Sequence, residues 1–109
     1  MTYRRLAVCL TVLTILPLIH LVAAIPPGFE DTLVASVESP TALAFTPDGR
    51  LLITSQRGEL RVVQNGTLLP TPVLDLSSRL CNNSERGLLG VAVDPAFTSN
   101  RFVYVYYTL

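Results

Sequence analysis

Two side chains of opposite charge, Glu85 and Arg86, stand next to each other directly before an apolar run that opens with Gly-Leu-Leu-Gly at 87–90. A carboxylate can accept hydrogen bonds from ligand hydroxyls, and a guanidinium can bind the carboxylates of a ligand. Arg57, which follows Gln56 in an earlier polar break, is a third candidate for ligand binding. The alternative is a solvated loop pair worth well under about 1 kcal/mol, with Arg57 as an ordinary surface charge.

Other catalytic chemistry has few candidate groups in this sequence. The only histidine, His20, lies in the apolar N-terminal segment, so the rest of the chain encodes no histidine-based catalysis. Asp48, Asp75 and Asp94 are too scattered along the sequence to predict a metal site. We therefore expect no catalytic residue and no metal ligand within these 109 residues.

The N-terminal segment has the composition of a secretory signal peptide. Two arginines precede the apolar run 6–22, and the sequence Val-Ala-Ala at 22–24 supplies the small residues that signal peptidase requires. We expect residues 1–24 to be the signal peptide and residues 25–109 the mature chain, which places the protein outside the cell or in the periplasm. After cleavage no membrane span is expected; a retained N-terminal anchor is the alternative.

The expected mature chain carries a small negative charge. Without Arg4 and Arg5, six of the eight basic residues remain against eight acidic ones, a net charge of −2. Such a balance offers no electrostatic surface for nucleic acid. Because Cys9 leaves with the signal peptide, Cys81 is unpaired, which in an oxidising compartment indicates either a reactive thiol or a disulfide partner beyond the printed sequence. We expect the second.

Short strands separated by Gly and Pro turns must position the candidate residues. The turn signals Pro-Asp-Gly at 47–49 and Asn-Gly at 65–66 separate apolar or alternating runs, and no segment has sustained helical periodicity. This pattern predicts an all-β meander. The expected strands are 32–37, 42–46, 50–55, 59–64, 72–76, 88–93 and 102–107.

An internal repeat indicates which all-β fold this is. The segment around Pro47 is echoed around Pro95, 48 residues later. Blades of a β-propeller repeat at roughly 40–50 residues and contain four strands. We therefore expect one complete blade and the start of a second. The strand 102–107 would aggregate if its aromatic edge stayed unpaired, so we expect the chain to be the N-terminal part of a larger propeller.

The topology of a propeller blade brings the candidate residues to one place. Alternate connections of a four-stranded meander lie at opposite ends of its sheet, so Arg57 shares an end with Glu85 and Arg86. Gly87 and Gly90 are expected to let the backbone approach the central axis, where a side chain would clash.

Two segments resemble the start of the glucose/sorbosone dehydrogenase family: "PTALAFTPDGRLLITSQRGELRVV" and "LDLSSRLCNNSERGLLGVAVDPAFTSNRFVYVYYT". The resemblance covers about residues 40–108 and implies a six-bladed propeller. It also implies a small-molecule sugar as substrate, and pyrroloquinoline quinone (PQQ) and calcium as cofactors of the full-length protein, with none bound by these residues alone. At the position of Glu85 the family has a Gln or Glu that faces the sugar, and Arg86 would tie the loop or screen the carboxylates of the quinone. Where this chain has Gln56, the family often has Glu.

The function that the resemblance implies is an exported, PQQ-dependent sugar dehydrogenase. Such an oxidoreductase oxidises the C1 hydroxyl or aldehyde of an aldose or sorbosone, and its catalytic base would lie outside this sequence. The alternative is a non-catalytic extracellular binding propeller of the hedgehog-interacting-like or NHL type, because fold does not determine function.

Overall fold

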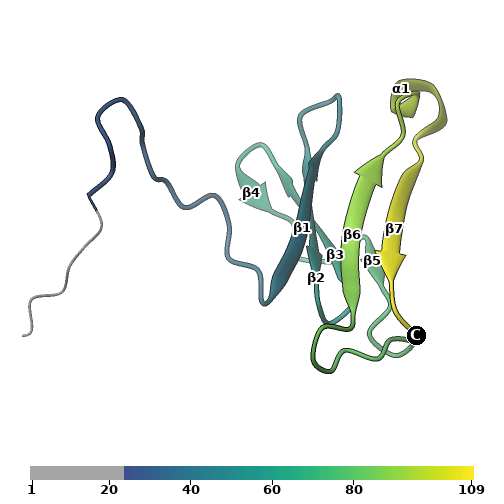
Figure 1. Ribbon diagram of the computed structural model, residues 1–109. Helices are drawn as coiled ribbons and strands as arrows, with labels where there is room; N and C mark the ends of the chain where they lie inside the picture. The colour runs from purple at the N-terminus through teal and green to yellow at the C-terminus, as the bar shows by residue number, and fades with distance from the viewer. Residues whose placement is uncertain (1–23) are drawn as a thin grey trace, which may run out of the picture. The chain divides into compact units, whose positions relative to one another are not determined.

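The computed structural model describes residues 24–109, which form mostly antiparallel β-structure (Figure 1). The predicted signal peptide, residues 1–24, lies outside the described residues except for Ala24. Among the described residues there is no helix long and apolar enough to cross a membrane. The chain divides into two units, Met1–Asp31 and Thr32–Leu109.

The described part of the first unit contains one tight turn. The Phe29 N–H donates a hydrogen bond of 3.1 Å to the carbonyl oxygen of Pro26. Pro27 and Gly28 are the central residues, and Gly28 has a φ of +88°. A type II turn requires positive φ at this position and favours proline just before it, so the sequence Pro-Pro-Gly explains the turn.

The second unit begins with an antiparallel sheet whose central order is β1-β2-β3. A fourth position beside β3 is occupied by two short pieces, because Pro70 and Pro72 between them have no N–H to give to the ladder. The four strands expected for one blade are therefore present, with the fourth split in two. The strands are β1 (Pro40–Phe45), β2 (Leu51–Ser55), β3 (Glu59–Gln64), β4 (Thr67–Leu68) and β5 (Leu74–Asp75).

The two turns predicted from sequence are both found. Gly49 N–H donates to the Thr46 carbonyl at 2.9 Å and closes the turn between β1 and β2. Asn65 and Gly66 have φ values of +51° and +74°. Positive φ at both central residues defines the type I′ hairpin that Asn-Gly favours.

The second sheet pairs β6 (Leu88–Val93) with β7 (Val103–Tyr107). Their connection contains α1 (Phe97–Asn100), a single helical turn where the sequence predicted only a loop. Hydrogen bonds to the side chain of Asp94, which precedes the helical turn, explain this difference. The Asp94 carboxylate accepts hydrogen bonds from the Ala96 N–H at 2.7 Å and from the Asn100 side-chain amide at 2.9 Å. Four residues are too few to show helical periodicity, so only these local hydrogen bonds reveal the turn.

The core lies between the two sheets. Leu52, Leu60 and Val62 of the first sheet are at most 5% exposed. Packed against them from the second sheet are half-buried valines, Val91, Val93, Val103 and Val105. Burying one such aliphatic side chain stabilises a fold by about 1.5–3 kcal/mol, so this contact is the main force that holds the sheets together.

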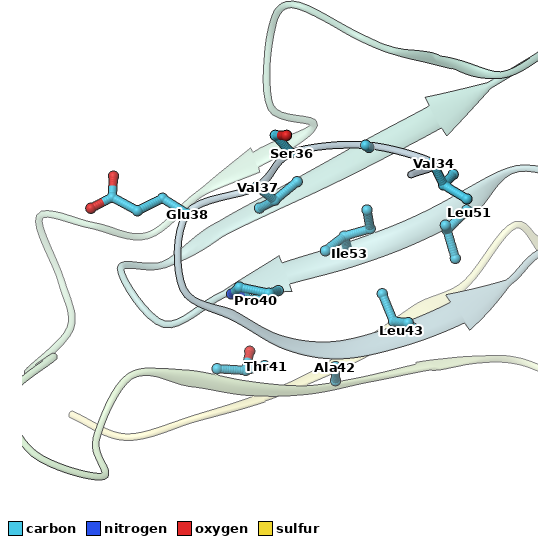
Figure 2. A pocket seen from close by; sticks show the side chains of 11 residues that line it. Val34, Ser36, Val37, Glu38, Pro40, Thr41, Ala42, Leu43, Leu51 and Ile53 are labelled. Atoms are coloured by element: carbon cyan, nitrogen blue, oxygen red, sulfur yellow. The ribbon is translucent and has the colours of Figure 1, made fainter. Parts of the chain in front are cut away.

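The faces turned away from this core are apolar and open. Leu43 pairs with Ile53 on the face opposite to Leu52, and Leu43 is 63% exposed. Residues 32–37 were expected to form a strand, but they join no ladder. Instead Val34 and Val37 line a groove of about 790 Å³ with Leu43 and Ile53 (Figure 2). The segment has residues that favour a strand, but the side chains of Val34 and Val37 lie over the sheet without main-chain pairing.

Candidate functional site

The loop that carries Glu85 and Arg86 packs against the turn after β2, at the end of the sheets opposite to α1 (Figure 1). The side-chain amide of Gln56 donates hydrogen bonds to the carbonyl oxygens of Ser84 at 2.5 Å and of Arg86 at 3.0 Å. The Leu88 N–H donates to the Gln56 carbonyl at 3.2 Å. The convergence of these two connections, predicted from the meander topology, is confirmed.

Gly87 is the residue that allows this close packing. Its φ is +140°, and a Cβ built on it would collide with the carbonyl oxygen of Gln56 and lie 2.8 Å from the Gln56 Cγ. A backbone approach that needs glycine is found at Gly87, but it is made to the neighbouring turn at Gln56, a contact that the sequence alone did not indicate. At Gly90 a Cβ would reach only ordinary contact, 3.4 Å from the Cβ of Tyr106. The expected approach of both glycines to a central axis stays a prediction.

The three predicted site residues lie at this one end, and all three are exposed. Arg57 forms an ion pair with Glu38 at 3.0 Å, a partner that sequence reasoning missed because the two residues belong to different connections. Arg86 ties the loop through its main-chain carbonyl, which accepts from Gln56, rather than through its charge. The Glu85 carboxylate therefore projects from a backbone that is held on both sides.

A third segment reaches the same end of the sheets. The Gln56 N–H donates to the carbonyl oxygen of Ser39 at 2.9 Å. Ser39 immediately precedes β1, so the connections before β1, after β2 and before β6 meet around Gln56. We call this end, defined by Glu38, Ser39, Gln56, Arg57 and residues 84–87, the Gln56 end. No signal in the sequence singled out Gln56 as the centre of this end.

Charges at the opposite end of the sheets are paired with one another. Arg50 binds Asp48 through two hydrogen bonds, of 3.0 Å and 2.7 Å, and Arg101 approaches the same carboxylate at 3.5 Å. The hydrogen bond from Arg50, followed by that from Thr46, holds the pKa of Asp48 well below its usual range. Both guanidinium groups lie over the ring of Phe97, at 5.8 Å and 5.5 Å. The carboxylate here is committed to internal contacts.

Asp94 is committed in the same way. The Tyr104 hydroxyl donates to its carboxylate at 2.6 Å, and this bond is the main reason why the pKa of Asp94 is lowered and that of Tyr104 is raised. Within residues 24–109 no three His, Cys, Asp or Glu side chains gather closely enough to hold a metal ion. Of the two ends, as the structure describes them for residues 24–109, the Gln56 end is the one where a carboxylate and a guanidinium, those of Glu85 and Arg86, are exposed and form no ion pair, beside Arg57 in its pair with Glu38.

Comparison with known proteins decides the family. The family model described as glucose / sorbosone dehydrogenase matches residues 37–109, which include both sheets and the whole loop with Glu85 and Arg86. The chain belongs to the glucose/sorbosone dehydrogenase family. The resemblance seen in the sequence at 40–108 is thereby confirmed.

Two proteins illustrate how this family member relates to others. A crystal structure from Thermus thermophilus, named as a "putative oxidoreductase (glucose dehydrogenase)", is 37% identical, with a TM-score of 0.64 over 72% of this chain. An uncharacterized protein of Synechocystis sp. is 34% identical in an alignment of 82 residues that covers 69% of this chain. The chain spans 22% of the length of that structure and 20% of the length of that protein.

Proposed function

We propose that the chain is the N-terminal part of an exported six-bladed β-propeller, with residues 1–24 as signal peptide. The first blade would be β1 to β5, and β6 and β7 would begin the second. Support comes from the four-stranded meander, the face-to-face packing of the second sheet on it and the exposed apolar outer faces. Phe45 on the first sheet is 71% exposed and Tyr106 on the second is 66% exposed. In a propeller, neighbouring blades would cover such faces.

In the whole protein we propose the activity of a sugar dehydrogenase that oxidises the C1 hydroxyl or aldehyde of a sugar. The observation that carries this proposal is the exposed Glu85 carboxylate on a clamped loop in a member of this family. Ionised carboxylates accept strong hydrogen bonds from hydroxyl groups, so Glu85 would bind sugar hydroxyls. Arg57 and Arg86, exposed at the same end, would assist ligand binding.

The cofactor we propose is PQQ, which accepts the electrons taken from the sugar when it is bound. Its carboxylates fit exposed arginines such as Arg86, which would bind or screen them. Calcium fits no cluster among residues 24–109, so its ligands and the base that takes the sugar proton would come from the rest of the protein.

The test uses the whole protein, purified without cofactor and then supplied with PQQ and Ca²⁺. We expect a panel of aldoses to reduce an artificial dye acceptor only when both PQQ and Ca²⁺ are present. PQQ binding, followed by its absorbance, serves as an independent measurement. A protein that binds PQQ but oxidises no aldose would refute the sugar substrate. A protein that binds neither PQQ nor calcium would be a non-catalytic binding propeller.

A further inference from the structure

The strongest unexplained feature of the Gln56 end is that one side-chain amide holds both peptide groups beside Glu85. The carbonyl of Ser84 precedes Glu85, and the carbonyl of Arg86 follows it. Gln56 Nε2 lies 2.5 Å from the first and 3.0 Å from the second. We propose that Gln56 is a positioning residue, which fixes the backbone of Glu85 and thereby aims its carboxylate at the ligand.

The donors and acceptors balance at this contact. A carboxamide nitrogen has two N–H groups, and each of the two carbonyl oxygens takes one. Because both neighbours are acceptors, the nitrogen rather than the oxygen of the carboxamide must face the loop. A single side chain thus restrains the backbone on both sides of one residue.

Gln56 is itself held firmly enough to act as such a support. The main-chain N–H of Gln56 donates to the Ser39 carbonyl at 2.9 Å, and the main-chain carbonyl of Gln56 accepts from the Leu88 N–H at 3.2 Å. Gln56 is half-buried and packs against Gly87, which has no side chain to prevent this contact. The support is therefore anchored in the strand ends rather than in the loop that it orders.

The loop has little else to order it. Residues 81–86 are all exposed. Within them the Arg86 N–H donates to the Asn83 carbonyl at 3.1 Å. Thr108 holds only the two ends of the loop: its hydroxyl donates to the Cys81 carbonyl at 3.4 Å and accepts from the Gly87 N–H at 2.9 Å. An exposed segment with few buried contacts samples many conformations, so losing the two bonds from Gln56 would free Glu85 to move. Positioning of the carboxylate would be lost while the sheets stay intact.

Substitutions of Gln56 that keep its length but remove its amide N–H donors test this role. Gln56→Glu introduces the residue that the family often has at this position. The side chain keeps its length but presents oxygens to two carbonyl oxygens, so attraction becomes repulsion and the restraint is specific to the amide of this chain. Gln56→Met also keeps the approximate length and removes the donors without adding charge, which provides a second variant in case the first does not fold. Gln64→Glu, the same substitution at an exposed residue at the other end of β3, is the matched control.

The first measurement is amide hydrogen exchange in the whole protein, which does not depend on the proposed activity. For Gln56→Glu or Gln56→Met we expect exchange of the Arg86 N–H, which donates to the Asn83 carbonyl within the loop, to be at least about tenfold faster than in the wild type, and exchange in β2 and β3 to be unchanged. Gln64→Glu should match the wild type. Wild-type exchange of the Arg86 N–H in both Gln56 variants would overturn the proposed restraint by Gln56.

The second measurement rests on the proposed function and tests whether Gln56 acts through Glu85. We expect Gln56→Glu to raise KM for aldose about tenfold with little change in kcat or in PQQ affinity. In a Glu85→Ala background, Gln56→Glu should add no further loss of kcat/KM, because the residue that it positions is gone. Additive losses would overturn the positioning role. A wild-type protein without activity would refute the proposed function and the sugar-binding role of Glu85 together. The exchange data would still decide whether Gln56 restrains the loop.

Discussion

The Thr41 hydroxyl donates a hydrogen bond of 2.6 Å to the carbonyl oxygen of Leu88, and this contact joins β1 of the first sheet to β6 of the second. The Leu88 side chain is fully buried. Because Thr41 has only one hydroxyl hydrogen, the buried Thr54 hydroxyl must donate the 2.9 Å bond between the two threonines. A short chain of hydrogen bonds, from Thr54 through Thr41 to Leu88, therefore connects the sheets directly behind the Gln56 end.

Replacing Thr41 should weaken the contact between the sheets. In Thr41→Val the side chain keeps its shape, but the Leu88 carbonyl loses this donor and the Thr54 hydroxyl keeps only the Ala42 carbonyl, at 3.3 Å. We expect the free energy of unfolding of the whole protein to fall by about 1–3 kcal/mol, the cost of leaving buried polar groups unpaired. Chemical denaturation checks this value. Thr32→Val, at an exposed residue, is the control, and an equal effect of both substitutions would contradict the role given to Thr41.

Replacing Gly87 or Gly66 by alanine separates the loss of stability due to close packing from the loss due to backbone conformation. Both have positive φ, but a Cβ meets the Gln56 carbonyl only at Gly87, whereas nothing lies within 4 Å of a Cβ at Gly66. We expect Gly66→Ala to cost about 1–2 kcal/mol from the backbone alone. Gly87→Ala should cost about 3 kcal/mol or more, because overpacking is added to the strained backbone. Equal changes in the denaturation midpoint would show that the loop can move away from Gln56.

The Asp94–Tyr104 bond should give stability that depends on pH at both extremes. The pKa of Asp94 is lowered in the folded protein, so its contribution is complete above the unfolded value of about 3.9 and is lost as pH falls through the folded value. The pKa of Tyr104 is raised, so its contribution is complete below about 10 and is lost as pH rises through the folded value.

Tyr104→Phe tests this prediction. Denaturation across a pH series should show that the substitution lowers stability between about pH 4 and pH 10 and flattens the decline at both ends. Tyr106→Phe, at an exposed residue on the same face of the sheet, is the control. If the two variants had the same pH profile, the Tyr104 hydroxyl would not bind Asp94 in solution.

Glu85→Ala tests the proposed ligand contact directly. Charge-assisted hydrogen bonds are worth about 1.5–3 kcal/mol each, so we expect kcat/KM for aldose to fall about ten- to a hundredfold in the whole protein. The thermal midpoint should barely change, since the side chain is exposed. The control is Glu30→Ala, because Glu38 and Glu59 each pair with an arginine, at 3.0 Å and 3.3 Å. If Glu85→Ala and Glu30→Ala were equally silent, Glu85 would be an ordinary solvated loop residue.

Cys81 should form a disulfide in the whole protein, which we propose is exported. It is exposed and makes no disulfide within residues 24–109. We expect its partner to lie elsewhere in the whole protein, as an oxidising compartment favours. Mass spectrometry of non-reduced peptides would identify the bond, and complete alkylation of Cys81 without reduction would contradict it.

Much of the local structure could be predicted from the sequence, because it depends on neighbours along the chain. Asn65 and Gly66 form the expected hairpin since both tolerate positive φ. The strands around 51–55, 59–64 and 88–93 follow from short apolar runs bounded by turns. The family was recognisable from the same segments, and the antiparallel β-structure and the end of the sheets that carries Glu85 were both predicted, while the six-bladed propeller stays a prediction.

Only the tertiary structure decided how the groups at that end are held. Gln56 lies 30 positions before Arg86 in the sequence, and its two bonds exist because two connections from different sheets pack together. The same packing makes a Cβ at Gly87 collide with Gln56 and brings one at Gly90 only into ordinary contact, although both glycines belong to the same Gly-Leu-Leu-Gly motif. Local propensity determines where a strand starts and turns, whereas the partner of a side chain depends on which surfaces the core brings into contact. For this reason the sequence by itself determined where Glu85 lies, and the tertiary structure decided what holds it in place.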